Sequence, residues 1–314
     1  MFLSAFFISL FSLILVIYLT HKYTLLMDDA GSDKPQNFHR NNTPRAGGVG
    51  ILTGMFLITL VPLGLKFLPS IILAFLSGIF EDFHNSLSPK VRLLLQLIAA
   101  MSAVVLADAV VTYLGLGISM PYWMGVIFSI FAIVGMMNAI NIIDGFNGLA
   151  SGVILLILIS FSIVSYQHNN LDILIVISIT SGATLGFILL NFPKGKIFLG
   201  DGGAYLLGFI VAVIGIFLAS KYESVSPWYI LALFIYPVWE VLFSIMRKLY
   251  MGLSPMQPDS YHFHMLVYRQ ITHNNPLTAL FIIGSIVPFM TLSTIFPNKS
   301  TTNIAIACCF ILYY

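Results

Sequence analysis

The stretch LGDGGAYLLGFIVAVIGIFLA, residues 199–219, combines a glycine-flanked acid with a long apolar run. Beyond Asp201 it contains no further Asp, Glu, Lys or Arg. About 20 apolar residues cross the hydrocarbon core of a bilayer as a helix. The stretch therefore predicts a membrane-spanning helix over 203–219 that begins beside a carboxylate.

The composition of the whole chain agrees with this prediction. The 314 residues are 59% hydrophobic and 8% charged, and the mean hydropathy is +0.97. Soluble domains carry about 25% charged residues, so we expect an all-α polytopic integral membrane protein. The net charge of +2 and the lack of a Lys/Arg cluster argue against nucleic acid as a partner.

Eleven apolar segments reach or approach the length of a span, which predicts about 10–11 transmembrane helices. The first, from Met1 to Leu19, lacks a basic start and a cleavage site, so we interpret it as a retained helix rather than a signal peptide. No linker or repeat divides the chain, and residues 1–314 are treated as one domain. The expected spans lie near 2–20, 47–65, 68–80, 91–108, 121–140, 149–165, 171–190, 203–219, 227–245 and 276–296, with a last, short one from 302 onward.

If these segments cross the membrane in alternating directions, the charged residues are distributed unequally between its two sides. Of the 14 Lys and Arg residues, only Lys66, Lys221 and Lys299 fall on one side. Cytoplasmic loops carry the excess of basic residues, so the other side is cytoplasmic and the N-terminus lies outside. Most acids fall on the cytoplasmic side as well: Asp28, Asp29, Asp33, Glu81, Asp82, Asp144, Asp201 and Asp259.

The adjacent acids Glu81 and Asp82 stand at the end of a predicted span, and Lys90 and Arg92 follow them. Two neighbouring carboxylates repel each other, and a divalent cation or a nearby base relieves that repulsion. The alternative is a pair of charges that reaches water at a helix end.

The stretch NAINIIDGFNGLASG, residues 138–152, places Asn138, Asn141 and Asp144 on one helix face. Gly145 then ends the helix, and Asn147 adds another amide. A row of amides with one acid suits a hydrogen-bonding ligand such as a nucleoside. The alternative is hydrogen bonding between membrane helices.

Asp201 stands between glycines at the start of a helix, shortly after Lys194 and Lys196. A metal ion and phosphate groups can meet at such a place, although an ordinary N-cap is the alternative. Farther along, His262, His264 and Arg269 share a polar loop. The two histidines lack a further zinc ligand nearby, so recognition of phosphate oxygens is the better interpretation.

Five motifs in this order resemble polyprenyl-phosphate N-acetylhexosamine-1-phosphate transferases. They are DKPQNFHRNNTPRAGG at 33–48, the Glu81–Asp82 pair, NxxNxxDGxxGLAxG from 138, LGDGGAYLLG from 199 and PDSYHFHM from 258. The resemblance covers a core of about 28–270. It departs from the family pattern where Glu81 and Asn147 each replace an Asp, and where Met265 stands in the histidine motif.

The resemblance implies transfer of a sugar 1-phosphate from a UDP-N-acetyl sugar to undecaprenyl phosphate, with release of UMP. The expected place is the bacterial inner membrane, and the expected cofactor is Mg²⁺ or Mn²⁺. Peptidoglycan-type members carry a longer insertion after the acidic pair. This chain therefore looks more like the transferases that begin O-antigen or teichoic acid synthesis with GlcNAc or a related sugar. The oligomeric state stays open, with a homodimer as one option.

The predicted site lies on cytoplasmic loops, and its reaction needs charge neutralisation more than a strong base. A phosphate monoester is already mostly dianionic at pH 7, whereas bringing two polyanions together calls for a metal ion and cations. We expect Asp201 and Asp82 to bind the metal, with Glu81 assisting Asp82 at the lipid phosphate. The nucleotide–sugar site is expected at Asn138, Asn141, Asp144 and Asn147, and phosphate contacts at Lys34, Arg45, His262, His264 and Arg269.

Two alternatives from other classes are compatible with the sequence. A secondary transporter would place its polar residues near the bilayer midplane, often in two repeated halves, and this sequence shows neither. A catalytically inactive relative is suggested by the changes at Glu81 and Asn147. Direct attack by the lipid phosphate and a phospho-enzyme on Asp82 are equally compatible with the sequence.

Overall fold

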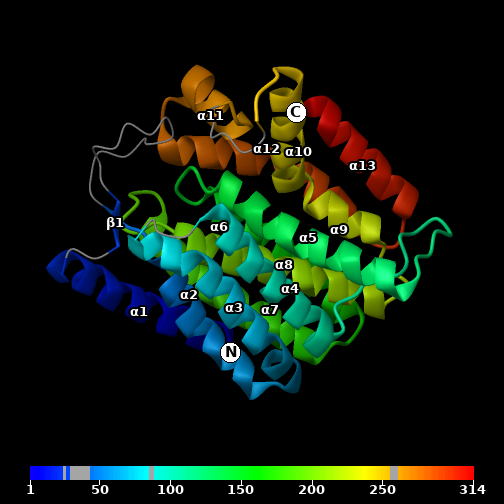
Figure 1. Ribbon diagram of the computed structural model, residues 1–314, viewed down its shortest axis with the longest axis horizontal. Helices are drawn as coiled ribbons and strands as arrows, with labels where there is room; N and C mark the ends of the chain where they lie inside the picture. The colour runs from blue at the N-terminus through cyan, green and yellow to red at the C-terminus, as the bar shows by residue number, and fades with distance from the viewer. Residues whose placement is uncertain (24–25, 29–42, 85–87, 255–260) are drawn as a thin grey trace.

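A computed structural model describes residues 1–23, 26–28, 43–84, 88–254 and 261–314 (Figure 1). Apart from the short antiparallel pair β1 (Met27–Asp28) and β2 (Thr43–Pro44), the regular elements among these residues are helices. The helices are α1 (Phe2–Tyr23), α2 (Gly47–Met55), η1 (Phe56–Leu60), α3 (Pro62–His84), α4 (Pro89–Ala107), α5 (Tyr122–Ile143), α6 (Leu149–Gln167), α7 (Leu171–Asn191), α8 (Gly200–Lys221), α9 (Pro227–Leu233), α10 (Ile235–Tyr250), α11 (Phe263–Val267), η2 (Tyr268–Thr272), α12 (Asn275–Ile295) and α13 (Ser300–Tyr313).

The prediction of an all-α polytopic membrane protein is confirmed, but the number of full spans is lower than predicted. Among the described residues, eight helices are long and apolar enough to cross a membrane, or nine if α9 and α10 form one bent span. The segments Gly47–Leu60 and Ser300–Tyr313 are shorter. At about 1.5 Å per residue they fall short of a hydrocarbon core of about 30 Å. Helix α3 is longer than the predicted 68–80 because it starts at Pro62 and continues through the acidic pair.

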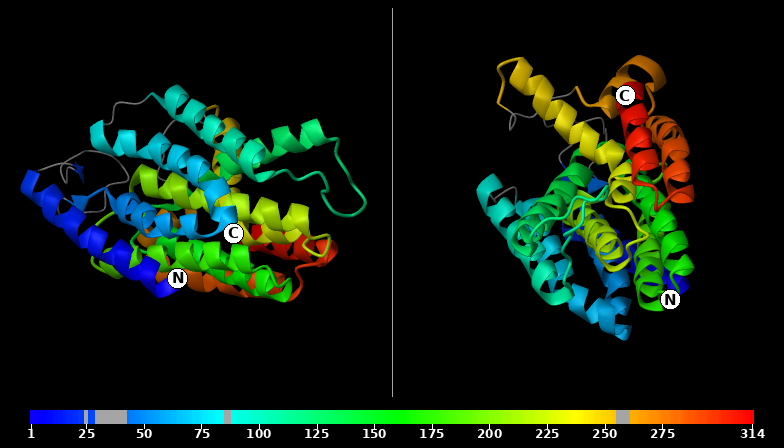
Figure 2. Two further views of the ribbon diagram at one scale, coloured as in Figure 1. Left: turned by 90° about the horizontal axis from the view of Figure 1, so that it is seen from below. Right: turned by 90° about the vertical axis from the view of Figure 1, so that its right-hand side faces the viewer.

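Helices α9 and α10 meet at an angle of 75°. Pro237, in the first turn of α10, has no backbone N–H to donate to the preceding turn. The helix therefore breaks at Phe234, between the two. In Figure 2, α10 (yellow) leaves the direction of the other helices and extends away from them.

Helix α8 lies at the centre of the bundle, because 89% of the residues in its 18-residue apolar stretch are buried. It packs against α2, α3, α5 and α6. Small residues allow these close approaches, as is usual where helices meet in membranes. A Cβ atom added to Gly48 of α2 would lie 2.4 Å from the backbone nitrogen of Gly203 in α8.

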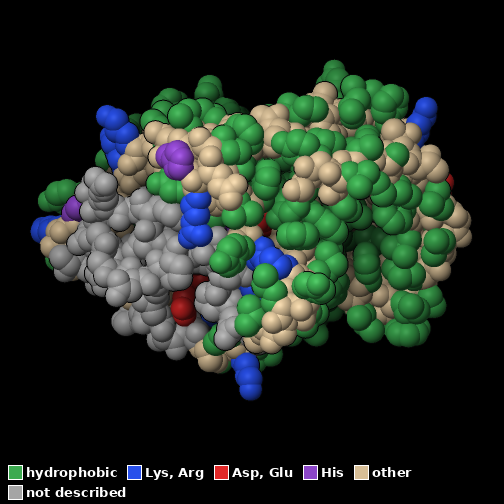
Figure 3. All heavy atoms as spheres, turned by 90° about the horizontal axis from the view of Figure 1, so that it is seen from above, with side chains coloured by type: hydrophobic (Ala, Val, Ile, Leu, Met, Phe, Trp, Pro, Cys, Tyr) green, Lys and Arg blue, Asp and Glu red, His purple; other side chains and the backbone are tan. Residues whose placement is uncertain are grey.

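Much of the surface is apolar. In the view of Figure 3, hydrophobic side chains cover most of the described surface away from the residues drawn in grey. Large side chains such as Val105, Phe131 and Tyr166 are more than two-thirds exposed. An exposed apolar surface of this extent marks contact with an apolar medium, here the lipid of a membrane.

Candidate functional site

The site is built around the N-terminus of α8, where the chain between α7 and α8 runs beside residues 43–48. Phe198 donates its backbone N–H to Pro44 O at 2.8 Å, and Gly47 donates to Phe198 O at 2.8 Å. Arg45 is paired with Phe198 in a parallel bridge. This pairing brings Arg45 to the start of α8.

Gly200 opens α8 with φ +74°, a conformation that L residues rarely adopt. A Cβ atom at this position would lie 2.7 Å from Asp82 Oδ2 and 3.0 Å from Arg45 O. The site therefore requires glycine here for two reasons, backbone conformation and space.

Asp82, at the end of α3, caps α8 from outside. Its Oδ1 accepts a hydrogen bond from the backbone N–H of Asp201 at 2.9 Å, and its Oδ2 accepts one from Gly202 at 2.9 Å. The first backbone N–H groups of a helix lack partners within the helix, and a carboxylate is favourable there. Gly78, one turn earlier in α3, permits the contact, since a Cβ there would lie 2.3 Å from the carbonyl carbon of Asp201.

The side chain of Asp201 is held between two other helices. Its Oδ1 accepts a hydrogen bond from Asn141 Nδ2 of α5 at 3.0 Å, and its Oδ2 accepts one from Arg92 Nη1 of α4 at 3.1 Å. The same Arg92 nitrogen lies 3.9 Å from Glu81 Oε1. Asp201 is not the N-cap, because Leu199 occupies that position. Its side chain is 19% exposed, so a ligand can reach it.

Asp144 follows the last turn of α5 and adds a further carboxylate to this group. Burial raises the pKa of Asp144 well above its usual range, the Arg45 guanidinium opposes that rise, and the charges of Asp201 and Asp82 add to it. The structure thus brings Asp82, Asp144 and Asp201 into one electrostatic cluster, which we call the acidic cluster.

Two of the predicted asparagines make structural hydrogen bonds. Asn138 Nδ2 donates to Gln96 Oε1 of α4 at 2.8 Å. Asn147 Nδ2 donates to Pro193 O at 3.1 Å, and its backbone N–H donates to Asn275 Oδ1 at 2.9 Å. These bonds tie α5 to α4 and the 144–148 turn to its neighbours. Whether either amide also contacts a nucleotide stays a prediction.

The histidines approach the same turn from α11. His262 and His264 are buried, and a Cβ atom at Gly145 would lie 3.1 Å from His264 Nε2. Burial lowers the pKa of His264 to about 4, although the nearby Glu240 carboxylate opposes this. His264 is therefore a neutral imidazole at pH 7. Arg269 is exposed on η2, and Lys34 lies outside the described residues.

Arg92 and Glu240 were not predicted as site residues. Arg92 lies in the first turns of α4, whose start is marked by Ser88 as N-cap and Pro89 at the first helical position. The predicted span near 91–108 came from its apolar length, and nothing in the sequence indicated that Arg92 pairs with Asp201. Glu240 was visible only as a carboxylate within an apolar segment, which is itself an indication of function.

The fold and the site define a membrane-embedded protein that gathers carboxylates and guanidinium groups at one end of its helix bundle, and comparisons with known proteins point to a transferase. The family model described as glycosyl transferase family 4 matches residues 65–219. A probable undecaprenyl-phosphate N-acetylglucosaminyl 1-phosphate transferase of Bacillus subtilis is 26% identical over 326 residues, covering 98% of this chain and 88% of that protein. A decaprenyl-phosphate N-acetylglucosaminephosphotransferase of Mycobacterium leprae is 28% identical over 309 residues, covering 86% and 78%.

The muramoyl branch matches too. A phospho-N-acetylmuramoyl-pentapeptide-transferase of Streptococcus agalactiae is 31% identical over 215 residues, which cover 60% of this chain and 64% of that protein. Residues 65–219, slightly less than half of the chain, thus match glycosyl transferase family 4, and the relatives that match most of the chain are named as sugar-1-phosphate transferases of a polyprenyl phosphate. The matched range 65–219 contains the acidic cluster and Arg92 but not the histidines.

Proposed function

We propose that this enzyme transfers an N-acetylhexosamine 1-phosphate from a UDP-sugar to undecaprenyl phosphate. The products are undecaprenyl-diphosphate-sugar and UMP, and the reaction begins a glycan of the O-antigen or teichoic acid type. The Bacillus and Mycobacterium relatives are named as N-acetylglucosamine phosphate transferases, which supports an N-acetylglucosamine donor, and these two alignments cover most of each protein. The muramoyl-pentapeptide relative matches a smaller part of the chain.

The observation that carries this proposal is the position of Asp201. Its carboxylate is fixed by Asn141 and Arg92, and its backbone N–H is fixed by Asp82. Phosphoryl transfer depends mainly on positioning and on stabilising negative charge. A rigid carboxylate with a guanidinium beside it can position the reacting groups and stabilise their charge. Its place at the end of a membrane bundle is accessible to a polar donor and to a lipid acceptor.

In the proposed reaction, an oxygen of the lipid phosphate attacks the β-phosphorus of the UDP-sugar. A new P–O–P linkage forms, the linkage within the UDP-sugar breaks, and UMP leaves with the electron pair of that bond. Direct attack is favoured over a phospho-enzyme because both oxygens of Asp82, the candidate nucleophile, accept backbone hydrogen bonds. Arg92 and Arg45 would stabilise charge on the phosphates.

The donor set of the site fits Mg²⁺. Glu81 and the acidic cluster contribute four carboxylates, against the guanidinium groups of Arg45 and Arg92. Among the described residues, no group of three or more His, Cys, Asp or Glu is arranged to hold a metal by itself. Mg²⁺ is commonly bound by one or two carboxylates together with substrate phosphates and water. Asp201, with Asp82 beside it, would hold the ion, which when bound neutralises charge on the leaving UMP.

The proposed site faces the cytoplasm, where UDP-sugars are made. The distribution of Lys and Arg supports this orientation. The test is to label single cysteines, in a background without Cys308 and Cys309, with a thiol reagent that does not cross membranes. In whole cells, a cysteine at the exposed position of Lys196, at the site end, should react only after the membrane has been made permeable. A cysteine at Lys221, at the other end, should react in intact cells.

The decisive experiment is UMP release by the purified protein with undecaprenyl phosphate, Mg²⁺ and a panel of UDP-N-acetyl sugars, with and without EDTA. Metal-dependent UMP from one sugar is the expected result and identifies the donor. UMP release that EDTA leaves unchanged would contradict the metal proposal, and no release from any sugar by the folded protein would contradict the donor class.

Metal binding has a second readout that does not depend on turnover. Mg²⁺ added together with UMP should raise the midpoint of thermal unfolding of the protein in detergent, because a ligand that binds only the folded state stabilises it. Asp201→Asn should abolish most of that increase. An equal increase in the variant would show that Asp201 does not hold the ion.

A further inference from the structure

We propose that Glu240 is a positioning residue, which holds the histidine segment (residues 261–264) against the active site. This inference rests on the proposed function. It gives a role to a buried carboxylate that lies outside the acidic cluster and outside the range of the matched family model.

Glu240 lies on α10 and is fully buried, with 0% exposure. Its Oε1 accepts hydrogen bonds from Phe263 N at 2.7 Å and from His262 Nδ1 at 3.2 Å. Its Oε2 accepts one from Tyr314 Oη at 2.8 Å. A buried carboxylate is costly unless donors surround it. Here the donors come from two segments outside α10, so the carboxylate joins three parts of the chain.

The hydrogen bond between Glu240 and His262 also determines the protonation of the imidazole ring. When a carboxylate accepts from Nδ1, the proton resides on Nδ1, and the other ring nitrogen, Nε2, is directed away from the carboxylate. Glu240 therefore sets both the tautomer and the orientation of the His262 ring. The backbone bond to Phe263 fixes the adjacent residue, so the ring has little freedom to swing.

The same carboxylate also orders His264. Oε1 of Glu240 lies 3.8 Å from His264 Nδ1, and the two imidazole rings are parallel within 1° with their centroids 5.5 Å apart. Tyr236 Oη lies 3.4 Å from His264 Nδ1. His264 Nε2, at the far side of the ring, is buried and has no hydrogen-bond partner in the described structure.

The unsatisfied Nε2 of His264 shows which part of the active site the histidine segment contacts. His264 Nε2 faces Gly145, directly after Asp144 of the acidic cluster. Buried polar atoms are normally hydrogen-bonded, and exceptions are found at functional sites. The chain of contacts from Glu240 through the histidines therefore ends at the turn that carries Asp144.

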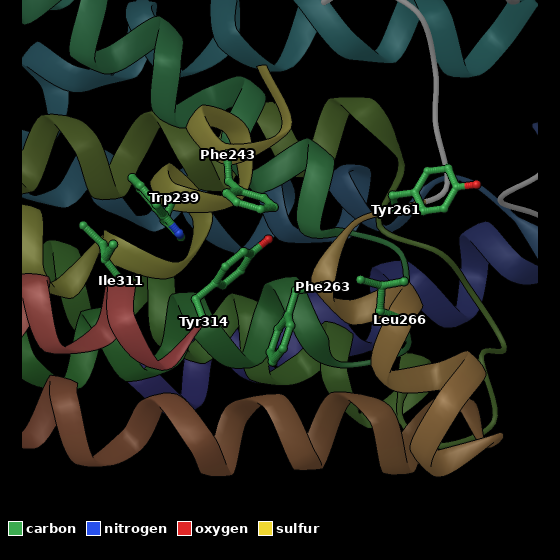
Figure 4. A pocket seen from close by; sticks show the side chains of 7 residues that line it. All are labelled: Trp239, Phe243, Tyr261, Phe263, Leu266, Ile311 and Tyr314. Carbon is green, nitrogen blue, oxygen red and sulfur yellow. The ribbon is translucent and has the colours of Figure 1, made fainter. Parts of the chain in front are cut away.

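Glu240 also fixes one wall of a cavity. Figure 4 shows aromatic and aliphatic side chains from α10, from α11 and Tyr261 before it, and from α13 and Tyr314 after it around this space, which measures about 240 Å³. The rings of Phe263 and Tyr314 belong to its lining, and both residues donate to Glu240. Displacing the carboxylate would therefore move the histidines and this wall together. The residues lining the cavity are Trp239, Phe243, Tyr261, Phe263, Leu266, Ile311 and Tyr314.

The test is Glu240→Gln in the full chain, assayed for kcat, for KM of the UDP-sugar and for the midpoint of thermal unfolding. Gln keeps the size but presents an amide in place of one oxygen, so a histidine donor or the Tyr314 hydroxyl loses its acceptor. We expect kcat to fall about 10- to 100-fold, as for a displacement of a site by about 1 Å. KM for the UDP-sugar should change less than about threefold, and the unfolding midpoint should stay within a few degrees.

A double-mutant cycle separates positioning from a general structural effect. If Glu240 acts through His262, the double variant Glu240→Gln/His262→Ala should be no slower than His262→Ala alone. Losses that multiply would overturn the proposal. Tyr229→Phe, on the neighbouring α9, is the matched control, because it removes another buried hydrogen bond, the one at 2.8 Å to Ser160 of α6, and should leave kcat unchanged.

A second variant protects the test from a failure to fold. Glu240→Asp keeps the charge but shortens the side chain by one methylene, so the carboxylate cannot reach both His262 and Phe263. It should lower kcat at least about fivefold, and a wild-type kcat would contradict positioning. Wild-type protein without UMP release would contradict the proposed function instead, so the two failures are distinguishable.

Discussion

The two ends of the bundle hold their carboxylates in different ways. At the site end, Asp82, Asn141, Arg92 and Asp201 come from four helices, and their hydrogen bonds join residues 60 to 120 positions apart. At the opposite end, Asp108 accepts a hydrogen bond from Tyr122, 14 positions away, in an exposed pair at 3.3 Å.

The difference lies in what each arrangement costs. An exposed pair contributes little, because water competes for both groups, and it can be lost with little effect. Several like charges gathered in a partly buried place oppose one another, and such clusters mark functional sites. The site end therefore holds an arrangement that a ligand completes, whereas the opposite end holds one that water already satisfies. Four changes test this contrast.

Asp201→Asn should have the largest effect, because it removes the central charge of the site end while keeping the shape. We expect kcat for UMP release to fall about 10³-fold or more, with the protein still folded. The assay is UMP release under saturating substrates, and circular dichroism reports folding. Near-normal turnover in the variant would remove Asp201 from the reaction.

Arg92→Lys should have the next largest effect. The charge remains, but lysine lacks the planar guanidinium whose Nη1 lies 3.1 Å from Asp201 and 3.9 Å from Glu81, and with it the further N–H groups that would bind phosphate oxygens. We expect kcat to fall about 10- to 100-fold. Lys90→Arg, an exchange two positions earlier, is the control. If Arg92→Lys were fully active, the guanidinium would serve as a counter-charge only.

Asp144→Asn should separate stability from activity. The folded pKa of Asp144 is raised, so the folded state binds this proton more tightly than the unfolded chain does. That contribution to stability is present at about pH 4 and below, and it is lost as the pH rises through the folded pKa. Replacing the charge should therefore raise the unfolding midpoint by about 2 °C at pH 8 and leave it unchanged near pH 4.

Thermal unfolding in detergent, with EDTA present, checks the Asp144 prediction, and UMP release by the same variant, assayed with Mg²⁺ and without EDTA, should fall. Asp172→Asn is the control. Asp172 is exposed in the first turn of α7, where the helix dipole favours a carboxylate, so its replacement should not raise the midpoint. A decrease for Asp144→Asn at pH 8 would mean that its charge is stabilised by the site.

Asp108→Asn should have the smallest effect. Its exposed bond to Tyr122 contributes little, so turnover and the unfolding midpoint should both stay at wild-type values. A clear loss of activity would break the comparison, because it would show that the opposite end takes part in function.

The sequence was sufficient to predict most of the long helices and the end of the bundle that collects the acids, because both depend on local hydrophobicity and charge. It was insufficient for contacts between residues far apart. The partner of Arg92, the cap that Asp82 places on α8 and the donors around Glu240 all arise where separate helices meet. The bend at Phe234 and the shortness of α2 with η1 were missed because their apolar composition resembles that of a straight span.

Asp82 and Glu81 are neighbours in the sequence but face different constraints on change. The length of the Asp82 side chain is fixed by the backbone of α8, because both of its oxygens accept hydrogen bonds from backbone N–H groups there at 2.9 Å. A longer acid at this position would displace the helix that carries Asp201. Glu81 meets Arg92 only at 3.9 Å, a distance that a side chain of another length can also satisfy. The first position of the pair is therefore open to evolutionary drift between Asp and Glu, while the second is fixed by the geometry of a helix elsewhere in the chain.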